Sequence, residues 1–526
     1  MLRSKGVAAT IHAIAPISVL TFWLFRSSSH LLSHDVAWFL FGSERMVDGA
    51  SLYRDVIDVN PPLVFYLGVP AAWLQHALGW SDIVLYRLGV LAALVLSLWL
   101  CNHFSRVLLA EFVPATHRHL TMLLAVLLTT LAASDFGQRE HIMIVLVLPY
   151  ILLCSVRILG RQVPPVQAFV VGFMGGIGLA LKPYFLILPL SMELLILIGT
   201  KHLHIGQRIE MMVIIAIQLL YYASILIFHS EYINVIVKMG KLYEAYNATW
   251  EELISNRASP LWFLSTVLVI VMRSKREGKA FRDVSYVAGS AFFVIALLQR
   301  KGWVYHFYPA MVILSLFVFS SLYVAATSGK RWMFQSMLRG LFKSEFAIPL
   351  LLLIGMVTFD GFWSARKKPY ADLIPYVEER AREKPIFVFS TSLTPAFPVI
   401  NYSHARWPWR FSSLWFLPGF YEQARNVAGG VFSYHSRAQM DTLEKQFFDG
   451  VLEDLIANHP VLMVRDTSAW HQGFGRTRFD FLEYYGQDQR FSRFIAQYVD
   501  QVRIGQYLIM EKQKGIAHDA GLHALD

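Results

Sequence analysis

Ionisable residues stand directly beside long apolar runs at several points of the sequence, and they are the first candidates for chemistry. Charged residues usually avoid such surroundings, because a charge next to an apolar segment loses part of its hydration. A carboxylate placed there can act as a general base, and a cation placed there can hold an anion. The residues concerned are His34-Asp35, Arg139-Glu140-His141, Lys182, Arg300-Lys301 and Tyr305-His306.

Asp35 is the leading candidate for a catalytic base. It follows the first apolar run, and partial loss of hydration is expected to raise its pKa toward a useful range. A second interpretation is structural, because Asp directly before an amphipathic stretch often caps the helix that follows. That stretch, Val36–Val47, has apolar residues at helical spacing and is predicted to lie along the membrane surface.

Polar residues recur in the rest of this first long loop and in the next short one. Tyr53, Asp55 and Asn60 precede a Pro-Pro pair and are candidate substrate-binding residues. The segment 134–141 holds Glu140, the second candidate catalytic carboxylate, with Asp135 as its competitor. Arg, Glu and His are more than a simple turn requires, although helix capping or snorkelling toward water would also account for them.

Three cations fall on loops that otherwise carry few. Lys182, Arg300 and Lys301 could together hold an anion such as the phosphate of a lipid donor. Tyr305 and His306 stand beside them as candidate substrate contacts. The aromatic residues of this stretch also fit the belt of Trp and Tyr found at membrane surfaces.

The elements that position these residues are membrane helices. Of 526 residues, 55% are hydrophobic and 16% charged, against roughly 45–50% and about 25% in soluble domains. Runs of about 20 apolar residues suffice to span a bilayer. We predict a polytopic α-helical membrane protein with about eleven spans, which begin near residues 11, 84, 120, 142, 166, 184, 211, 260, 284, 306 and 346.

Loop charge predicts the orientation of the spans. The run Leu63–Trp80 contains Pro70, Gln75 and His76, and the charge balance depends on whether it crosses. If it does not cross, the loops on the side of the N-terminus carry 17 Lys and Arg and the opposite loops carry 9. The positive-inside rule therefore favours a cytoplasmic N-terminus, with Leu63–Trp80 at the interface or re-entrant. Ile11–Phe25 lacks a following cleavage site and is expected to remain as an anchor.

The composition changes near residue 361. The segment 362–526 has 19 Lys and Arg against 18 Asp and Glu, and it contains no run long enough to span. We predict two domains: a transmembrane domain, 1–361, which includes the first outer loop 28–82 with its in-plane helices, and a soluble extracytoplasmic α/β domain, 362–526. In the latter, strands are expected at 385–390, 460–464 and 507–511, and helices at 372–384 and 442–458.

Several other features are assigned packing roles. The net charge of +10 follows from the basic cytoplasmic loops, so no nucleic-acid partner is expected. The glycine-rich Gly172–Gly178 lies inside a span, where close helix packing is its expected use. The segment 406–419 is rich in Trp and Arg, which could stack on sugars but more often belong to a core.

The first outer loop, SHDVAWFLFGSERMVDGASLYRDVIDVNPPLVFYL, resembles that of the C-type glycosyltransferase (GT-C) superfamily. In layout it is similar to the branch of lipid A aminoarabinose transferases and protein O-mannosyltransferases. The resemblance covers about residues 1–325. It implies that Asp35 is the catalytic Asp of the first loop and that Glu140 matches the second acidic position. Asn60-Pro61-Pro62 stands where the aminoarabinose enzymes carry Lys before Pro, so Lys182, Arg300 and Lys301 would supply the phosphate contacts.

The resemblance implies an inverting glycosyltransferase. The donor would be a polyprenyl-phosphate-linked sugar, the acceptor a lipid, glycan or protein, and the location the outer face of a bacterial inner membrane. No cofactor is required by the sequence, although a divalent cation bound by the acidic pair is possible. The alternatives are a lipid-linked sugar transporter or flippase and a non-catalytic membrane assembly subunit. A transporter should carry ionisable residues at mid-depth, and a scaffold has no need to bring Asp35, Glu140 and Lys182 together.

Overall fold

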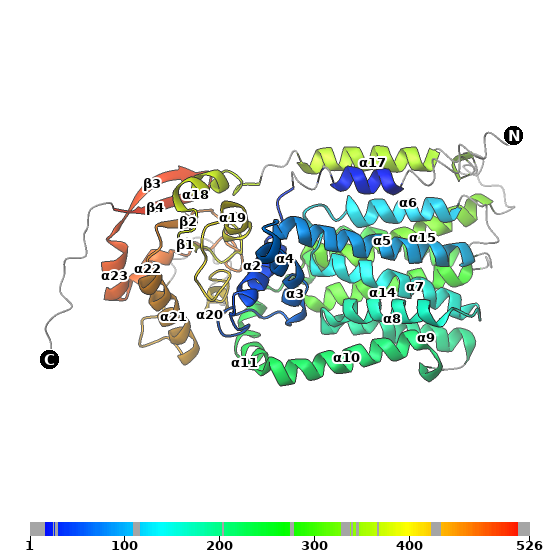
Figure 1. The fold of residues 1–526 in the computed structure, drawn as a ribbon, viewed down its shortest axis with the longest axis horizontal. Coiled ribbons are helices and arrows are strands. Elements are labelled where there is room, and N and C mark those ends of the chain that lie inside the picture. Colours follow the sequence, from blue (N-terminus) through cyan, green and yellow to red (C-terminus); the bar gives the residue numbers. More distant parts are fainter. Residues whose placement is uncertain are drawn as a thin grey trace. The chain divides into compact units, whose positions relative to one another are not determined.

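The computed structural model (Figure 1) describes residues 16–24, 26, 30–108, 116–201, 205–273, 278–327, 337, 340–342, 344, 347–364, 368–421 and 433–513. Its contacts divide the chain into two units. The membrane unit comprises Met1–Val36, Pro61–Phe228 and Asn247–Arg366, and the C-terminal unit comprises Ala37–Asn60, His229–Tyr246 and Lys367–Asp526. The sequence places one boundary, after residue 361. The contacts place it after Arg366 and add two inner segments to the C-terminal unit.

The membrane unit is a bundle of helices. Its α-helices are α3 (Leu63–Tyr66), α4 (Val69–Leu78), α5 (Asp82–Leu108), α6 (Thr116–Thr129), α7 (Arg139–Ile158), α8 (Pro165–Ala180), α9 (Ile187–Thr200), α10 (Ile209–Phe228), α12 (Trp250–Ile254), α13 (Ala258–Val271), α14 (Lys279–Gln299), α15 (Val304–Thr327) and α17 (Ala347–Ser364). Among the described residues, six helices are long and apolar enough to cross a membrane, and α8, α13 and part of α17 are shorter apolar helices. The predicted polytopic helical fold is confirmed.

Two sequence predictions fall partly outside the described residues. Of the first predicted span, Ile11–Phe25, residues 16–24 are described and are helical. Most of the predicted basic loop 326–345 also lies outside the described residues.

Helix α7 is the central helix of the membrane unit. Every residue from Arg139 to Val156 is buried, and the helix packs against α5, α8, α9, α14 and α15. Its first turn consists of Arg139, Glu140 and His141. Because α7 is enclosed by neighbours, these three polar residues are held away from lipid at the end of the bundle where the helix begins.

Glycines allow α8 and α10 to approach closely, as expected for Gly172–Gly178. A Cβ atom on Gly172 would lie 2.6 Å from the carbonyl oxygen of Glu210. One on Gly176 would lie 2.7 Å from Cδ1 of Ile217. A side chain at either position would therefore push the two helices apart, so the packing interpretation of this segment is confirmed.

The ambiguous run Leu63–Trp80 contains α3 and α4, which together form one apolar helical segment, Leu63–Leu78, because Leu67 and Gly68 between them keep helical dihedral angles. A helix of this length measures about 24 Å, less than the roughly 30 Å of a hydrocarbon core. The predicted orientation of the spans stays a prediction.

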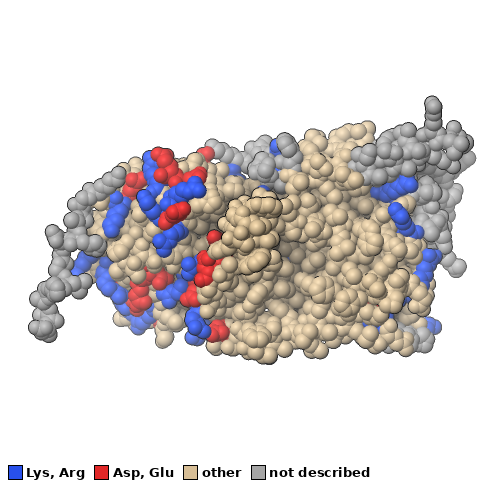
Figure 2. Space-filling view, in the orientation of Figure 1, with Lys and Arg blue, Asp and Glu red and all other residues tan. Residues whose placement is uncertain are grey.

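Charge is unevenly distributed along the membrane unit. On the face shown in Figure 2, a broad band over the described helices lacks Lys, Arg, Asp and Glu, and Lys and Arg gather at the end where α5 and α7 finish. Both helices carry an acidic residue in the first turn, Asp82 or Glu140, and a basic one in the last, Arg106 or Arg157. The orientation of these helices in the membrane stays a prediction.

The C-terminal unit is a small α/β domain. Its elements are α11 (Ser230–Met239), α18 (Leu373–Ala381), β1 (Ile386–Phe389), α19 (Ala396–Ser403), α20 (Leu417–Phe420), α21 (Thr442–Asn458), β2 (Leu462–Asp466), α22 (Phe481–Gly486), α23 (Gln489–Ile495), β3 (Tyr498–Ile504) and β4 (Tyr507–Lys512). The sheet has the order β1-β2-β4-β3, with β1 parallel to β2 and the other pairs antiparallel. In this unit, the face shown in Figure 2 carries basic and acidic residues side by side.

Helix α2 (His34–Val47) differs from its prediction. The stretch was expected to lie along the membrane with one face exposed, but residues 36–43 are all buried. The Trp38 ring packs edge-on to Phe397 of α19, and Nε1 of Trp38 donates a 2.7 Å hydrogen bond to Asp58. The Asn401 side chain donates to the carbonyl oxygen of Ala37. Protein covers both faces of this helix, so the surface-helix interpretation is wrong.

The Trp-rich segment belongs to the core of the C-terminal unit. Trp407 and Trp409 are buried, and their indole nitrogens donate to the carbonyl oxygens of Phe411 and Ile386. Arg410 forms a bidentate ion pair with Asp454. These contacts occupy the polar atoms of the two indoles, so core packing, rather than stacking on sugars, is confirmed for them.

Candidate active site

Asp35 lies in the first turn of α2, where its carboxylate is available for contacts other than capping. The side chain that accepts a hydrogen bond from the N–H of Val36 is that of Ser33, at 3.4 Å, so Ser33 takes the capping role considered for Asp35. Oδ2 of Asp35 accepts a 2.7 Å bond from Nε2 of Gln138 and lies 3.2 Å from Nη2 of Arg139. Nε2 of the His34 ring lies 3.5 Å from the other carboxylate oxygen of Asp35, Oδ1.

The pKa of Asp35 is shifted in the direction opposite to the sequence prediction. Burial opposes ionisation of this carboxyl, as expected. Electrostatic interactions with His34, Arg139 and Lys182 outweigh burial and lower the pKa of the carboxyl below its usual value. A hydrogen bond from Tyr305 acts in the same direction. Asp35 is therefore ionised at neutral pH.

A second cluster of buried polar groups surrounds Lys182. Its ammonium group donates hydrogen bonds to Oε1 of Glu140 and, at 2.8 Å, to Oε1 of Gln299. Nε2 of His306 lies 3.3 Å from the same nitrogen. Lys182 follows α8, Glu140 begins α7, Gln299 ends α14 and His306 lies in the first turn of α15. Four helix ends thus meet around one cation.

Two buried atoms of this cluster have no hydrogen-bond partner within the described part of the chain. They are Oε2 of Glu140, an acceptor, and Nδ1 of His306. If the ammonium group donates to Nε2 of His306, the proton of the ring resides on Nδ1, which becomes a donor. The cluster can therefore offer one acceptor and one donor to a substrate hydroxyl or a phosphate oxygen.

Burial also perturbs Lys182 itself, which lies between α8 and the predicted span Pro183–Thr200. Burial disfavours the ammonium ion and lowers the pKa of Lys182 to about 8, although the charge of Glu140 raises it in part. At neutral pH the side chain remains mostly protonated and neutralises Glu140.

The two clusters form one continuous site. Asp35 contacts Arg139, and the next residue, Glu140, contacts Lys182. The charge of Lys182 is felt at Asp35 as well. Asp35, Glu140 and Lys182 therefore converge, as an enzyme requires and as a scaffold has no reason to arrange.

Other predicted residues of the membrane unit are placed around this centre or used otherwise. Both ring nitrogens of His141 hydrogen-bond to the backbone, Nδ1 with the N–H of Gly137 and Nε2 with the carbonyl oxygen of Leu128. The substrate-binding interpretation of His141 is thus replaced by a structural role. At the end of α14, Arg300 is exposed over the Trp250 ring. Nζ of Lys301 donates to Asn247.

Tyr53, Asp55 and Asn60 lie in the C-terminal unit, and their side chains form hydrogen bonds within the loop. The Tyr53 hydroxyl donates to the carbonyl oxygen of Asn60, and Asp55 accepts from the N–H of Ser51. The amide of Asn60 donates to Asp58. These bonds shape the loop itself, and the substrate-binding role of the three residues stays a prediction.

Sequence reasoning missed two members of the site, Gln138 and Gln299. Each is an amide at the end of a predicted span, and each binds a charged candidate, Asp35 or Lys182. Amides carry no charge, so a search for ionisable residues passes over them. Their positions could have identified them. Gln138 directly precedes α7 and Gln299 is the last residue of α14, and charged candidates lie beside both.

The acidic pair does not fit a divalent cation. Asp35 is engaged by Gln138 and Arg139, and Glu140 by Lys182, so both carboxylates face hydrogen-bond donors or cations. Among the described residues, no group of three or more His, Cys, Asp or Glu could hold a metal ion.

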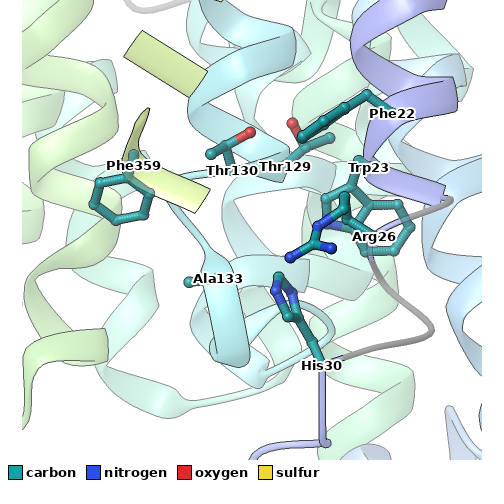
Figure 3. A pocket seen from close by; sticks show the side chains of 8 residues that line it. All are labelled: Phe22, Trp23, Arg26, His30, Thr129, Thr130, Ala133 and Phe359. Carbon is teal, nitrogen blue, oxygen red and sulfur yellow. The ribbon is translucent and has the colours of Figure 1, made fainter. Parts of the chain in front are cut away.

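A small recess lies elsewhere in the membrane unit. Figure 3 shows the Arg26 guanidinium and the His30 ring pointing toward each other between Trp23 and Phe359. The enclosed volume is about 10 Å³, roughly that needed to hold one water molecule. This recess is therefore too small to bind a substrate.

Comparison with solved structures relates this arrangement to a known fold. The chain is similar to ArnT from Cupriavidus metallidurans bound to undecaprenyl phosphate, with a TM-score of 0.56 at 14% identity over 97% of this chain and 98% of that one. This chain has the fold of ArnT. The apo structure of ArnT gives a TM-score of 0.55 at 14% identity over 96% of this chain and 98% of that one. No protein-family model and no curated protein matches the sequence. The helical membrane fold that the resemblance implied is thus confirmed.

Proposed function

We propose that the chain is an inverting glycosyltransferase that takes a sugar from a polyprenyl-phosphate donor. The observation that carries the proposal is the buried, ionised Asp35 beside Arg139, in a chain with the fold of ArnT. ArnT has been solved with undecaprenyl phosphate bound, which supports a polyprenyl phosphate as the lipid partner. The acceptor would be a lipid, glycan or protein at the outer face of a bacterial inner membrane.

The reaction needs one base and a stabilised leaving group. The oxygen of an acceptor hydroxyl attacks the anomeric carbon and Asp35 takes its proton, while the bond from that carbon to the phosphate oxygen breaks on the opposite face. The products are the glycosylated acceptor and the polyprenyl phosphate. Because its pKa is low, Asp35 is a weak base and would take the proton late, once bond formation has made the hydroxyl acidic.

The surrounding cations are proposed to stabilise the negative charge of the leaving phosphate. Lys182 is engaged by Glu140, Gln299 and His306, so its contribution would come through the field of the whole cluster. Arg300, exposed at the end of α14, and the adjacent Lys301 are the candidates for direct phosphate contacts.

The transporter and the assembly-subunit hypotheses gain no specific support. In the site described above, the ionisable side chains are grouped at helix ends. A transporter of a lipid-linked sugar would need such groups near mid-depth in its helices.

The test is the Asp35→Asn variant, with Asp48→Asn as its matched control. Asp48 lies just after α2 and is exposed. A deletion strain is complemented with each variant, and its glycolipids and surface glycans are compared by mass spectrometry. We expect Asp35→Asn to reduce the product by at least about a hundredfold at unchanged protein level, with Asp48→Asn like the wild type. Normal product with Asp35→Asn would refute the assignment of the base.

A further inference from the structure

The turn that precedes α7 is held by two buried side chains to which the reaction above gives no part. The turn ends at Gln138, whose amide donates to Asp35. Tyr86 on α5 and His141 on α7 both bind the backbone of the turn at Gly137. All five residues belong to the membrane unit.

Both polar groups of the Gly137 backbone are bound by these side chains. The Tyr86 hydroxyl donates a 2.7 Å hydrogen bond to the carbonyl oxygen of Gly137. The N–H of Gly137 donates to Nδ1 of His141 at 3.2 Å. Nε2 of His141 lies 2.7 Å from the carbonyl oxygen of Leu128. A carbonyl oxygen can only accept, so the ring carries its proton on Nε2 and Nδ1 is the acceptor. Helices α5 and α7 therefore fix the same backbone residue.

Gly137 has a conformation that other residues rarely adopt. Its φ angle is +84°, in the left-handed region. A Cβ atom at this position would lie 2.8 Å from Cε1 of Tyr86, so the tyrosine ring packs directly against the glycine. The path of the turn thus depends on the missing side chain at Gly137 and on the ring of Tyr86 together.

The next residue, Gln138, uses both ends of its amide. Oε1 accepts from the N–H of Glu140 at 3.4 Å and caps α7, and Nε2 donates to Oδ2 of Asp35 at 2.7 Å. The N–H can only donate, and the ionised carboxylate can only accept. If the amide turned over, it would place donor against donor and acceptor against acceptor. The position of the Gln138 backbone therefore decides where the donor meets Asp35.

A catalytic base is sensitive to displacements of this kind. A shift of about 1 Å in a reacting group can lower a rate on the order of a hundredfold. Gly137 and Gln138 share one planar peptide, so a movement of the Gly137 carbonyl also moves the backbone of Gln138. Because both ends of the Gln138 amide are bound, its side chain cannot follow Asp35 independently of that backbone.

We infer that Tyr86, Gly137 and His141 are positioning residues for the base of the transfer. They fix the turn before α7 and thereby direct the Gln138 amide to Oδ2 of Asp35. The inference rests on the proposed function, because it takes Asp35 to be that base. Loss of either side-chain contact to Gly137 should lower the rate of transfer by more than the loss of folded protein explains.

The first test is a double-variant cycle of Tyr86→Phe and Gln138→Leu. Membranes of the complemented deletion strain supply the native donor and acceptor, and mass spectrometry follows the product that the deletion strain lacks. Protein amounts are matched, and melting temperatures are measured on the full chains in nanodiscs. We expect Tyr86→Phe to lower the rate about tenfold. In the presence of Gln138→Leu, which also lowers the rate, it should lower it no further.

Tyr498→Phe is the matched control for Tyr86→Phe. The Tyr498 hydroxyl is buried in the C-terminal unit and donates to the carbonyl oxygen of Pro460, also at 2.7 Å. The two variants lose the same kind of hydrogen bond, so their melting temperatures should fall by similar amounts. Only Tyr86→Phe should lower the rate of transfer.

The second test compares two amides at His141. Oδ1 of an asparagine side chain can take the place of Nδ1 and accept from Gly137, whereas the longer glutamine side chain reaches toward Leu128 in place of Nε2. His141→Asn should therefore retain severalfold more activity than His141→Gln. A role in packing alone predicts no such order, because each variant keeps one of the two contacts of the ring.

Two results would overturn the inference for Tyr86: additive losses in the double-variant cycle, or a rate for Tyr86→Phe equal to that of Tyr498→Phe. Equal rates in the two His141 variants would overturn it for His141. Asp35→Asn separates this inference from the proposed function. Product formed by Asp35→Asn refutes the assignment of the base, whereas an inactive Asp35→Asn beside a fully active Tyr86→Phe refutes the positioning role alone.

Discussion

Removing Lys182 from the buried Lys182–Glu140 ion pair should cost more stability than removing Glu140, because the group left behind differs. Lys182→Met leaves Glu140, whose side chain is 1% exposed, as a carboxylate without a cation. Removal of one partner of a buried pair costs about 3–5 kcal/mol. Gln299 also loses the donor that reaches it at 2.8 Å. We expect this variant to be strongly destabilised.

The reverse change, Glu140→Gln, should cost much less. The pKa of Lys182 is about 8, which is one unit above neutral pH. Deprotonation of the ammonium group at pH 7 therefore costs about 1.4 kcal/mol, and the neutral amine can remain buried beside the new amide. Loss of the proton from Lys182 therefore limits how far Glu140→Gln lowers the free energy of unfolding. Lys182→Met has no such outlet. The double variant removes both charges and should be more stable than Lys182→Met alone.

The assay is unfolding of the full chain in nanodiscs at pH 7, followed by tryptophan fluorescence, for the wild type, both single variants and the double variant. Lys241→Met, a change at an exposed lysine, is the control and should shift the free energy by less than about 0.5 kcal/mol. Equal losses in the two single variants, together with a double variant that shows their sum, would refute the reasoning, because the pair would then not be coupled.

Three further predictions concern Asp35 and the helix that carries it. The transfer rate should fall as the pH rises through about 8, where Lys182 loses its proton, and a pH–rate profile of Lys182→Arg should show this limb moved to higher pH because a guanidinium stays charged. Trp38→Phe leaves Asp58 without the indole donor and should lower the free energy of unfolding by about 1–3 kcal/mol, measured by the same unfolding assay. Ser33→Ala removes the cap of α2; Asp35 can then turn to cap the helix itself, so kcat should fall without any change to the base, and Ser33→Thr should restore it.

Elements whose signal is local could be predicted from the sequence. Thr442–Asn458 was expected as a helix and is one, because Asp441 caps it and apolar residues recur at helical spacing. The spans were visible because a run of about 20 apolar residues indicates a membrane helix whatever its neighbours are. Strand β3 (Tyr498–Ile504) was missed, because Asp500, Gln501 and Arg503 interrupt its apolar residues and it pairs along one side only, with β4.

Properties that depend on distant partners could not be predicted. The surface position expected for α2 was wrong because Trp38 packs against Phe397, which lies far along the chain. The direction of the Asp35 pKa shift was wrong for the same reason. A sequence shows that Asp35 adjoins an apolar run, and hence that it is buried. It does not show that Arg139 and Lys182 come to lie beside it.

The chemistry of Asp35 depends on a division of tasks between adjacent residues. A short side chain in the first turn of a helix cannot both cap the backbone and reach a substrate, because the cap turns its oxygens back toward the helix. Ser33 caps α2, and the carboxylate of Asp35 is thereby directed to Gln138 and Arg139. Arg139, which helps to keep Asp35 ionised, also fixes its orientation together with Gln138. A low pKa, which by itself makes a weaker base, is therefore the consequence of holding that base in one place, and positioning can compensate for lost basicity when the acceptor oxygen is bound next to it.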